Sequence, residues 1–246
     1  MSNAVVVGAT TGVGRALARA LAAQGHNLVI VGRERGDLDA LLSDLRFRAA
    51  QTFEAVAQDI ADPGWNVEAF AEHCERCLGG SIDAVFVPAG GAREDDVGAR
   101  FELVEPVAAV NYVGPARVAA VFGARMASRG AGVVVLVSSI AATAPRTKNA
   151  AYSAAKAALE VYGKALRHAL EPRGVRIITV ALGYVDTSQS FGLQLALPVA
   201  SPEAVADGLI ALSRGGGGHY HLPRFWWLVT TTLRLLPWPV YRHLKA

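Results

Sequence analysis

Charged residues are scarce in this sequence of 246 amino acids, and cysteines are scarcer still. Only 18% of the residues are charged, whereas 52% are hydrophobic, a composition that excludes a disordered or charged-repeat chain. Two cysteines cannot build a disulfide framework, which favours a reducing setting. The 24 basic and 21 acidic residues leave a net charge of +3 without a run of like charge. We therefore expect no nucleic-acid partner.

The start of the chain has no secretory pattern either. It opens with an apolar, strand-like stretch at residues 4–7 instead of a charged segment followed by an apolar one and a cleavage site. These features together favour a cytoplasmic protein. The length suits one domain spanning residues 1–246.

Short β-branched runs alternate with helical patterns along the chain, a pattern typical of repeated βαβ units around a parallel sheet. Most of the runs are continuously apolar, as strands are when helices cover both faces of the sheet. We therefore predict an α/β fold, a Rossmann-type doubly wound parallel sheet of about seven strands. The expected strands are residues 5–7, 28–31, 52–57, 84–87, 133–137, 176–181 and 219–222.

A glycine-rich turn follows the first expected strand and leads into the first helical pattern. Its small residues allow the backbone to approach a pyrophosphate closely, and the helix N-terminus offers free N–H groups and a favourable dipole. An ordinary tight turn is the alternative interpretation. The residues assigned to cofactor binding here are Gly8, Thr10, Thr11, Gly12, Val13 and Gly14.

Four further motifs follow this turn in a fixed order. Ala89 and Gly90 close the fourth strand, Asn111 lies in the next helix, Ser139 ends the fifth strand, and Tyr152-x3-Lys156 opens the helix after it. Ser139 precedes Tyr152 by 13 residues. With these motifs, residues 4–222 resemble the short-chain dehydrogenase/reductase family, classical type. The resemblance implies a dinucleotide-dependent oxidoreductase that assembles as a dimer or tetramer.

The end of the second expected strand bears on the choice of cofactor. Gly32 stands where NAD-preferring relatives carry an acidic residue, and Arg33 follows with a planar fork suited to a phosphate. We therefore expect an NADP(H) site with Arg33 as the phosphate ligand and Arg35 as a weaker candidate, although Arg33 could also be an ordinary turn residue. By resemblance, Asp59 and Ile60 contact the adenine; otherwise Asp59 is a strand-end cap.

Tyr152 and Lys156 lie four residues apart and project from one face of a helix. A free tyrosine has a pKa of about 10, and a nearby ammonium group stabilises its phenolate. Tyr152 is thus a candidate proton donor, and the Ser139 hydroxyl can join it in stabilising a carbonyl oxygen. The resemblance further implies that Lys156 holds the nicotinamide ribose and that Asn111 orders a water in a proton relay.

After the sixth strand, residues 182–187 resemble the family segment Pro-Gly-x-x-x-Thr, which contacts the nicotinamide and the phosphates. Gly183, Val185 and Thr187 are assigned to cofactor binding on this basis. The sequence departs from the family pattern at two places. Leu182 replaces the proline, and Pro88 stands in a position where many members carry asparagines before Ala-Gly.

Two apolar regions follow. Residues 188–200 correspond to a short substrate lid without any charge, which favours a lipophilic or aromatic substrate, although a small lid can also pack on the core. Residues 208–246 contain no acidic residue, and residues 224–246 combine arginines with three tryptophans. This segment is too short and broken to span a bilayer. It suits a membrane surface, or it covers the substrate cleft or a subunit interface.

The sequence thus predicts an NADPH-dependent carbonyl reductase, or the reverse alcohol dehydrogenase, acting on a small apolar carbonyl compound or alcohol. One alternative is ketoreduction of a carrier-bound or polycyclic biosynthetic intermediate. Another is a non-catalytic NADPH-binding sensor or interaction protein, which would not need Ser139, Tyr152 and Lys156 together. Cys74 and Cys77 form a CxxC pair without further ligands, so we expect two free thiols on a surface helix and no metal site.

Overall fold

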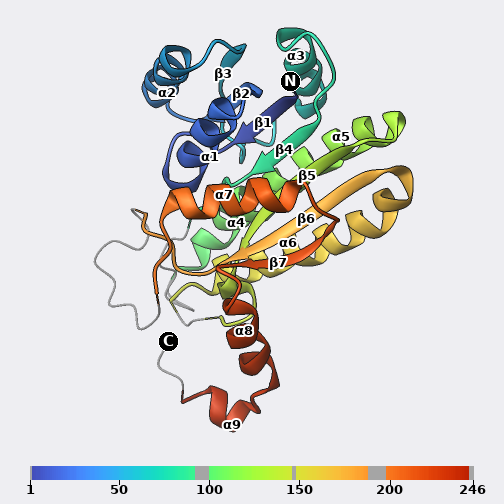
Figure 1. Cartoon of the computed structure of the whole chain (residues 1–246). Helices are drawn as coiled ribbons and strands as arrows, with labels where there is room; N and C mark the ends of the chain where they lie inside the picture. Colours follow the sequence, from blue (N-terminus) through green and yellow to red (C-terminus); the bar gives the residue numbers. More distant parts are fainter. Residues whose placement is uncertain (1, 92–99, 146–147, 188–197, 244–246) are drawn as a thin grey trace.

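Seven strands form one parallel sheet in the order β3-β2-β1-β4-β5-β6-β7 (Figure 1). The computed structural model describes residues 2–91, 100–145, 148–187 and 198–243. The predicted α/β fold is confirmed, and each predicted strand is present within two residues at either end. The strands are β1 (Asn3–Val7), β2 (Asn27–Gly32), β3 (Phe53–Ala57), β4 (Ala84–Val87), β5 (Gly132–Ser139), β6 (Val175–Leu182) and β7 (Gly218–Leu222).

Helices cover both faces of this sheet (Figure 1), so the inner strands are buried on both sides, whereas the edge strands β3 and β7 are partly exposed. One apolar cluster joins the sheet to α1 (Gly12–Ala23), α2 (Arg35–Arg48) and α7 (Pro202–Ser213). The other joins it to α3 (Val67–Cys77), α5 (Gly114–Arg129) and α6 (Ala150–Leu170). This two-sided burial explains why the strand sequences are continuously apolar. The remaining helical elements are η1 (Phe101–Leu103), α4 (Val104–Ala108), η2 (Ala109–Val113), η3 (Ile140–Ala142), η4 (Glu171–Arg173), α8 (Trp226–Leu235) and α9 (Trp238–Tyr241).

The strand order reverses at the centre of the sheet. The chain builds outward from β1 to β2 and β3, then crosses back so that β4 pairs with the other side of β1. The chain that follows β1 therefore leads toward one half of the sheet, and the chain that follows β4 leads toward the other half. A crevice at such a switch point is where open α/β sheets bind their ligands.

Helix α3 differs from expectation in one respect. Cys74 lies in the core between the helix and the sheet, and only Cys77 is partly exposed. Both thiols are free, as expected, but only one of them reaches the surface. The two side chains are neighbours on α3, and the edge of its buried face runs between them, because Cys74 is buried with Phe70 and Cys77 is not.

The C-terminal helices extend beyond the last strand, where α8 leaves the end of β7 and α9 lies at the extremity of the molecule (Figure 1). Trp226 and Thr230, one turn apart, are the buried residues of α8. The Thr230 hydroxyl lies 3.0 Å from His221 Nε2 on β7 and also donates to the Trp226 carbonyl. Helix α8 is thus attached to the sheet by one narrow face.

This attachment predicts an acid-sensitive contribution to stability. Burial, together with the neighbouring His219 and Arg234, lowers the pKa of His221 from 6.5 to about 4, and the Glu160 carboxylate opposes this change. The unfolded chain therefore binds this proton at a higher pH than the folded chain does. The stability that the neutral imidazole contributes is complete above about pH 6.5 and is lost as the pH falls toward about 4.

We expect the urea midpoint of unfolding to fall across this acid window in the unaltered protein and to fall less in His221→Gln. The exposed His168 on α6 provides the control, and His168→Gln should keep the full pH dependence. An identical pH profile for the unaltered protein and His221→Gln would contradict the assignment.

Candidate active site

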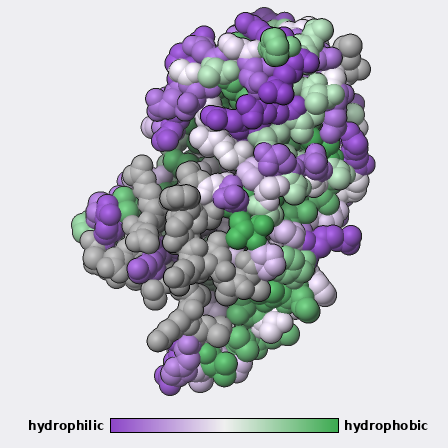
Figure 2. All heavy atoms as spheres, turned by 60° about the vertical axis from the view of Figure 1, so that its left-hand side comes forward, coloured by the Kyte–Doolittle hydropathy of each residue, from purple (hydrophilic) through white to green (hydrophobic). Residues whose placement is uncertain are grey.

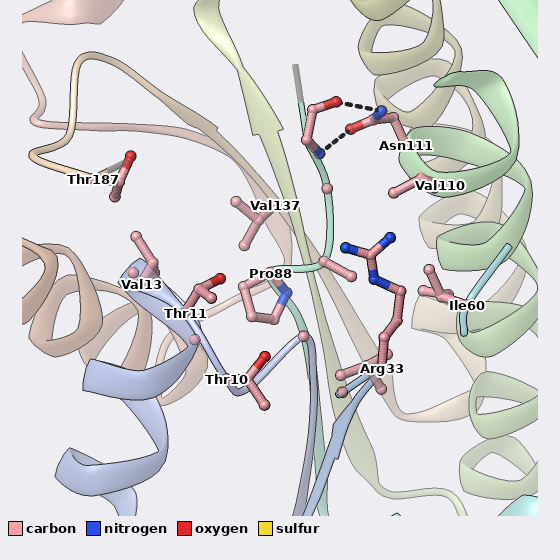
Figure 3. Close-up of a pocket in the computed structure, with 18 of the residues that line it drawn as sticks. Thr10, Thr11, Val13, Arg33, Ile60, Pro88, Val110, Asn111, Val137 and Thr187 are labelled. Atoms are coloured by element: carbon pink, nitrogen blue, oxygen red, sulfur yellow. Dashed lines mark hydrogen bonds between the residues drawn. The ribbon is translucent and has the colours of Figure 1, made fainter. Parts of the chain in front are cut away.

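A cavity of about 620 Å³ opens at the carboxyl ends of the strands, at the switch point of the sheet. Apart from Arg35, the weaker phosphate candidate, the residues that the sequence assigns to the cofactor or to catalysis all line this cavity. They come from segments far apart in the chain and meet because the parallel strands end at one edge (Figure 3). Sequence reasoning did not assign several further lining residues, which include Glu34, Asp37, Gln58, Pro88, Val110, Val137 and Tyr184.

The glycine turn after β1 is closely packed against its neighbours. The N–H groups of Gly8 and Ala9 both donate to the Val31 carbonyl at 2.9 Å. A Cβ at Gly14 would lie 1.9 Å from the Gly8 carbonyl oxygen, and a Cβ at Gly8 would lie 2.7 Å from Ala89 Cα. Only glycine fits at these two positions. The turn therefore exposes backbone N–H groups at the start of α1, as a pyrophosphate requires.

The end of β2 carries glycine followed by arginine at the cavity wall. A Cβ at Gly32 would lie 2.6 Å from Thr10 Cγ2, so a side chain there would require Thr10 to move. The Arg33 side chain extends into the cavity, between Pro88 and Ile60 in the view of Figure 3. Arg35 instead pairs with Asp39 at 3.0 Å on α2 and does not line the cavity. Of the two predicted phosphate ligands, Arg33 is the one in position.

Asp59 and Ile60 lie beyond β3 on the same wall. Asp59 Oδ1 accepts a hydrogen bond of 2.9 Å from the Ala61 N–H, so this carboxylate caps the turn. Ile60 is buried and offers an apolar surface. Asp59 thus acts as the cap that the alternative interpretation expected, and its contact with an adenine stays a prediction.

Asn111 lies in the π-helical turn η2, fully buried between α4 and α5. Its Oδ1 accepts from the Gly91 N–H at 3.0 Å, and its Nδ2 donates to the Gly91 and Val107 carbonyls at 2.9 Å (Figure 3). The amide therefore fixes the loop after β4, and Pro88 precedes that loop where relatives carry asparagines. Sequence reasoning expected a water-ordering residue and did not anticipate this clamp.

Ser139, Tyr152 and Lys156 lie together on one wall of the cavity. The side chain of Ser139 hydrogen-bonds the phenol of Tyr152. Lys156 Nζ lies 5.8 Å from the centre of the Tyr152 ring and donates to the Val137 carbonyl at 2.9 Å. Burial raises the pKa of Tyr152, and the Ser139 hydrogen bond opposes that rise. The arrangement places two hydroxyls side by side beside a buried amine.

Lys156 is only 3% exposed. Burial lowers its pKa to about 8, and the Glu160 carboxylate opposes this by favouring the ammonium. Glu160 lies one helical turn further along α6, and it accepts from Ser138 Oγ at 2.9 Å. His219 Nε2 and Arg234 Nη2 approach the same carboxylate at 3.3 and 3.9 Å. Glu160 therefore links the buried lysine to β7 and α8.

The sequence analysis passed over Glu160 and Ser138. The four-residue spacing from Lys156 to Glu160 was a usable signal, because residues at this spacing share a helix face. The contribution of His219 and Arg234 had no such signal, since it depends on β7 pairing with β6 and on the placement of α8.

A family model described as short chain dehydrogenase matches residues 2–193. The dehydrogenase/reductase SDR family member 7B of Mus musculus is 32% identical over 199 residues, which are 77% of this chain and 60% of that protein. A very-long-chain 3-oxoacyl-CoA reductase of Pyrenophora tritici-repentis is 26% identical over 228 residues, 87% of this chain and 64% of that protein. The chain thus spans less than two thirds of the length of these relatives.

Two solved structures are similar over the whole chain. A short-chain dehydrogenase from Sphingobium yanoikuyae in complex with NADPH has a TM-score of 0.81 at 24% identity, covering 100% of this chain and 97% of that one. The bulky-bulky ketone specific alcohol dehydrogenase from Comamonas testosteroni has a TM-score of 0.79 at 25% identity, covering 100% and 95%.

With its glycine turn, its Ser-Tyr-Lys group and this family match, the chain belongs to the short-chain dehydrogenase family. It is therefore a member of a family of oxidoreductases that use a nicotinamide dinucleotide, NAD(H) or NADP(H).

The cluster around Glu160 generates a prediction for the pH dependence of activity. Removing the carboxylate charge removes the interaction that opposes the effect of burial on Lys156, so the pKa of Lys156 should fall below about 8. Tyr152 titrates at higher pH, because its pKa is raised. Lys156 is therefore the first of the two groups to lose its proton as the pH rises.

We expect Glu160→Gln to move the alkaline fall of kcat/KM for the cofactor, which reports on the free enzyme, to lower pH. Glu171→Gln, an exposed carboxylate paired with Arg167, is the matched control and should leave the profile in place. A loss of rate at every pH without a shift of the alkaline limb would indicate only a structural role for Glu160.

Proposed function

We propose that the protein is an NADPH-dependent reductase of lipophilic ketones, which also runs in reverse as an alcohol dehydrogenase. The observation that carries this proposal is the placement of the Ser139, Tyr152 and Lys156 side chains on the wall of a cavity whose opposite end is the glycine turn. A sensor that only bound the dinucleotide would need the turn but not the two hydroxyls beside a buried amine.

The proposed chemistry assigns one task to each side chain. Bound NADPH supplies the hydride to the carbonyl carbon. The hydroxyls of Ser139 and Tyr152 donate hydrogen bonds to the carbonyl oxygen as negative charge develops on it, and Tyr152 delivers the proton. The Lys156 ammonium lies close enough to the Tyr152 ring to stabilise the phenolate that this transfer leaves. Asn111 fixes the loop of Gly91 beside the reacting atoms.

NADPH is favoured over NADH by two features at the end of β2. At the cavity wall, Gly32 provides no carboxylate that would bind the ribose 2′-hydroxyl and repel a 2′-phosphate. Arg33 supplies a guanidinium on the wall of the same cavity. Glu34 and Asp37 also line this region, so the arginine must outweigh two nearby carboxylates. The NADPH complex of the Sphingobium yanoikuyae dehydrogenase supports the same choice.

An apolar substrate is supported by the apolar part of the cavity lining. Pro88, Val110 and Val137 provide apolar surface (Figure 3), and Tyr184 adds an aromatic side chain. Residues 188–197 of the expected lid lie outside the described residues. The names of two similar proteins, a bulky-bulky ketone specific alcohol dehydrogenase and a very-long-chain 3-oxoacyl-CoA reductase, agree with a bulky or long ketone.

The proton donor is tested by Tyr152→Phe. We expect kcat for ketone reduction to fall by about 10² to 10⁴, the usual contribution of a positioned acid, while the dissociation constant of NADPH stays nearly unchanged. The matched control is Tyr162→Phe on the same helix, which does not line the cavity. NADPH consumption with a panel of bulky ketones gives kcat, and quenching of protein fluorescence gives the dissociation constant. Unchanged turnover in Tyr152→Phe would refute the proton donor.

The cofactor preference is tested by Arg33→Ala. A charge-assisted hydrogen bond contributes about 1.5–3 kcal/mol, so NADPH binding should weaken about tenfold to a hundredfold while NADH binding changes little. Arg35→Ala is the matched control, because Arg35 pairs with Asp39 outside the cavity. An equal loss for both dinucleotides, or a preference of the unaltered protein for NADH, would overturn the role of Arg33.

A further inference from the structure

We propose that the segment formed by α8 and α9 binds the surface of an anionic lipid membrane. The proposal concerns a surface outside the cavity. It is independent of the proposed reaction, because it is tested by binding to lipid and not by turnover.

The first observation is a concentration of exposed apolar side chains on these two helices. Trp227 is 60% exposed, Trp238 70% and Leu235 79%. Leu228 is 63% exposed and Val240 is 50% exposed. Hydrophobic atoms gather over the end of the molecule that α8 and α9 occupy, whereas the opposite end is mostly hydrophilic (Figure 2). A contiguous apolar patch of this kind indicates a binding surface, in contrast to single exposed residues such as Phe47.

The second observation is the state of the threonine hydroxyls on α8. Thr231 Oγ1 donates to the Trp227 carbonyl at 2.7 Å, and Thr232 Oγ1 donates to the Leu228 carbonyl at 2.9 Å. Each hydroxyl is thus satisfied within its own helix, and the methyl group remains for contact. Internal hydrogen bonding of this kind allows a threonine-bearing helix face to enter an apolar medium without leaving a polar group unpaired.

The third observation is the charge around the patch. Arg224, Arg234 and Arg242 are exposed, and residues 208–246 contain no acidic residue. Trp side chains are favoured at the boundary between lipid and water, and arginines beside them attract anionic headgroups. A patch that is apolar, aromatic and cationic therefore fits an anionic lipid surface better than a second apolar protein face.

The segment is attached where it can place the cavity near that surface. Trp226 packs edge-on against Tyr184, a lining residue, with ring centres 5.1 Å apart. Arg234 donates to Thr143 Oγ1 at 3.2 Å and Tyr241 donates to the Pro145 carbonyl at 2.9 Å, both in the loop that follows Ser139. A membrane under α8 and α9 would thus lie beside two of the loops at the carboxyl edge of the sheet.

Within the described part of the chain, the segment Phe101–Arg129 has the length and composition of a membrane-spanning helix. Half of its apolar window is buried, and α5 within it packs against the sheet. It is a core helix and carries no part of the proposal.

The test is flotation of the whole chain with vesicles. The protein should float with vesicles of phosphatidylcholine mixed with phosphatidylserine, should float much less with phosphatidylcholine alone, and should be released by added salt. The double variant Trp227→Ser with Trp238→Ser should reduce the lipid-bound fraction about tenfold, since each change removes an exposed aromatic anchor. Both side chains are exposed, so the variant should keep the thermal midpoint of the unaltered protein.

Phe47→Ser is the matched control, because Phe47 is an exposed aromatic residue on α2, away from α8 and α9. It should leave flotation unchanged. The proposal is overturned if the unaltered protein floats with neither vesicle, or if Phe47→Ser reduces flotation as much as the double variant. Sedimentation tests the alternative that the patch contacts a second copy of the chain. The proposal is also overturned if the unaltered protein is a dimer that does not bind lipid, and if the double variant, but not Phe47→Ser, dissociates this dimer.

Discussion

Parallel pairing of all seven strands is the constraint on which the site depends. Because the strands run in one direction, β1, β2, β4, β5 and β6 end at one edge, and the loops after them form a single wall. The reversal of order between β1 and β4 parts those loops and leaves the cavity between them. The glycine turn and the Ser139 end of β5 are separated by more than a hundred residues in the chain, and only this topology brings them to one cavity.

The price of this architecture is a buried cation on α6. Lys156 is almost wholly removed from water, and removing an ammonium group from water lowers its pKa unless partners compensate. The Val137 carbonyl accepts one hydrogen bond from it, and the Glu160 carboxylate supplies the opposing charge. The pKa of Lys156 is about 8, so a modest change in the surrounding charge alters its protonation near neutral pH. The chemistry on the Tyr152 side and the fold on the Glu160 side are connected through this one residue.

The sequence was a sufficient guide to the sheet because two-sided burial leaves a strong mark. Runs such as residues 133–137 are continuously apolar for a physical reason, and the structure buries each of them. The glycine turn was equally readable, since Gly8 and Gly14 occupy positions that no side chain can take. Motifs that are local in the sequence were thus placed correctly. Between Arg33 and Arg35, the sequence left a choice that only the side-chain directions resolve.

Contacts between distant segments could not be read in this way. The clamp of Asn111 on Gly91, the approach of His219 to Glu160 and the packing of Trp226 near Gly183 each join residues whose separation in the chain carries no periodic signal. Cys74 illustrates the same limit at short range. The sequence predicted two free thiols on a surface helix, and both are free, but the buried face of α3 includes Cys74 and excludes Cys77. The position of each cysteine on the helix, and not the CxxC motif, determines whether its thiol is exposed.

Trp226 explains how the C-terminal segment can matter to the cavity while exposing so much apolar surface. A ten-residue helix is marginal by itself, and Trp226 and Thr230 are the residues that α8 buries. The indole lies so close to Gly183 that a Cβ there would be 1.8 Å from Nε1. Gly183 in turn lines the cavity, so this close packing joins α8 directly to the wall of the site.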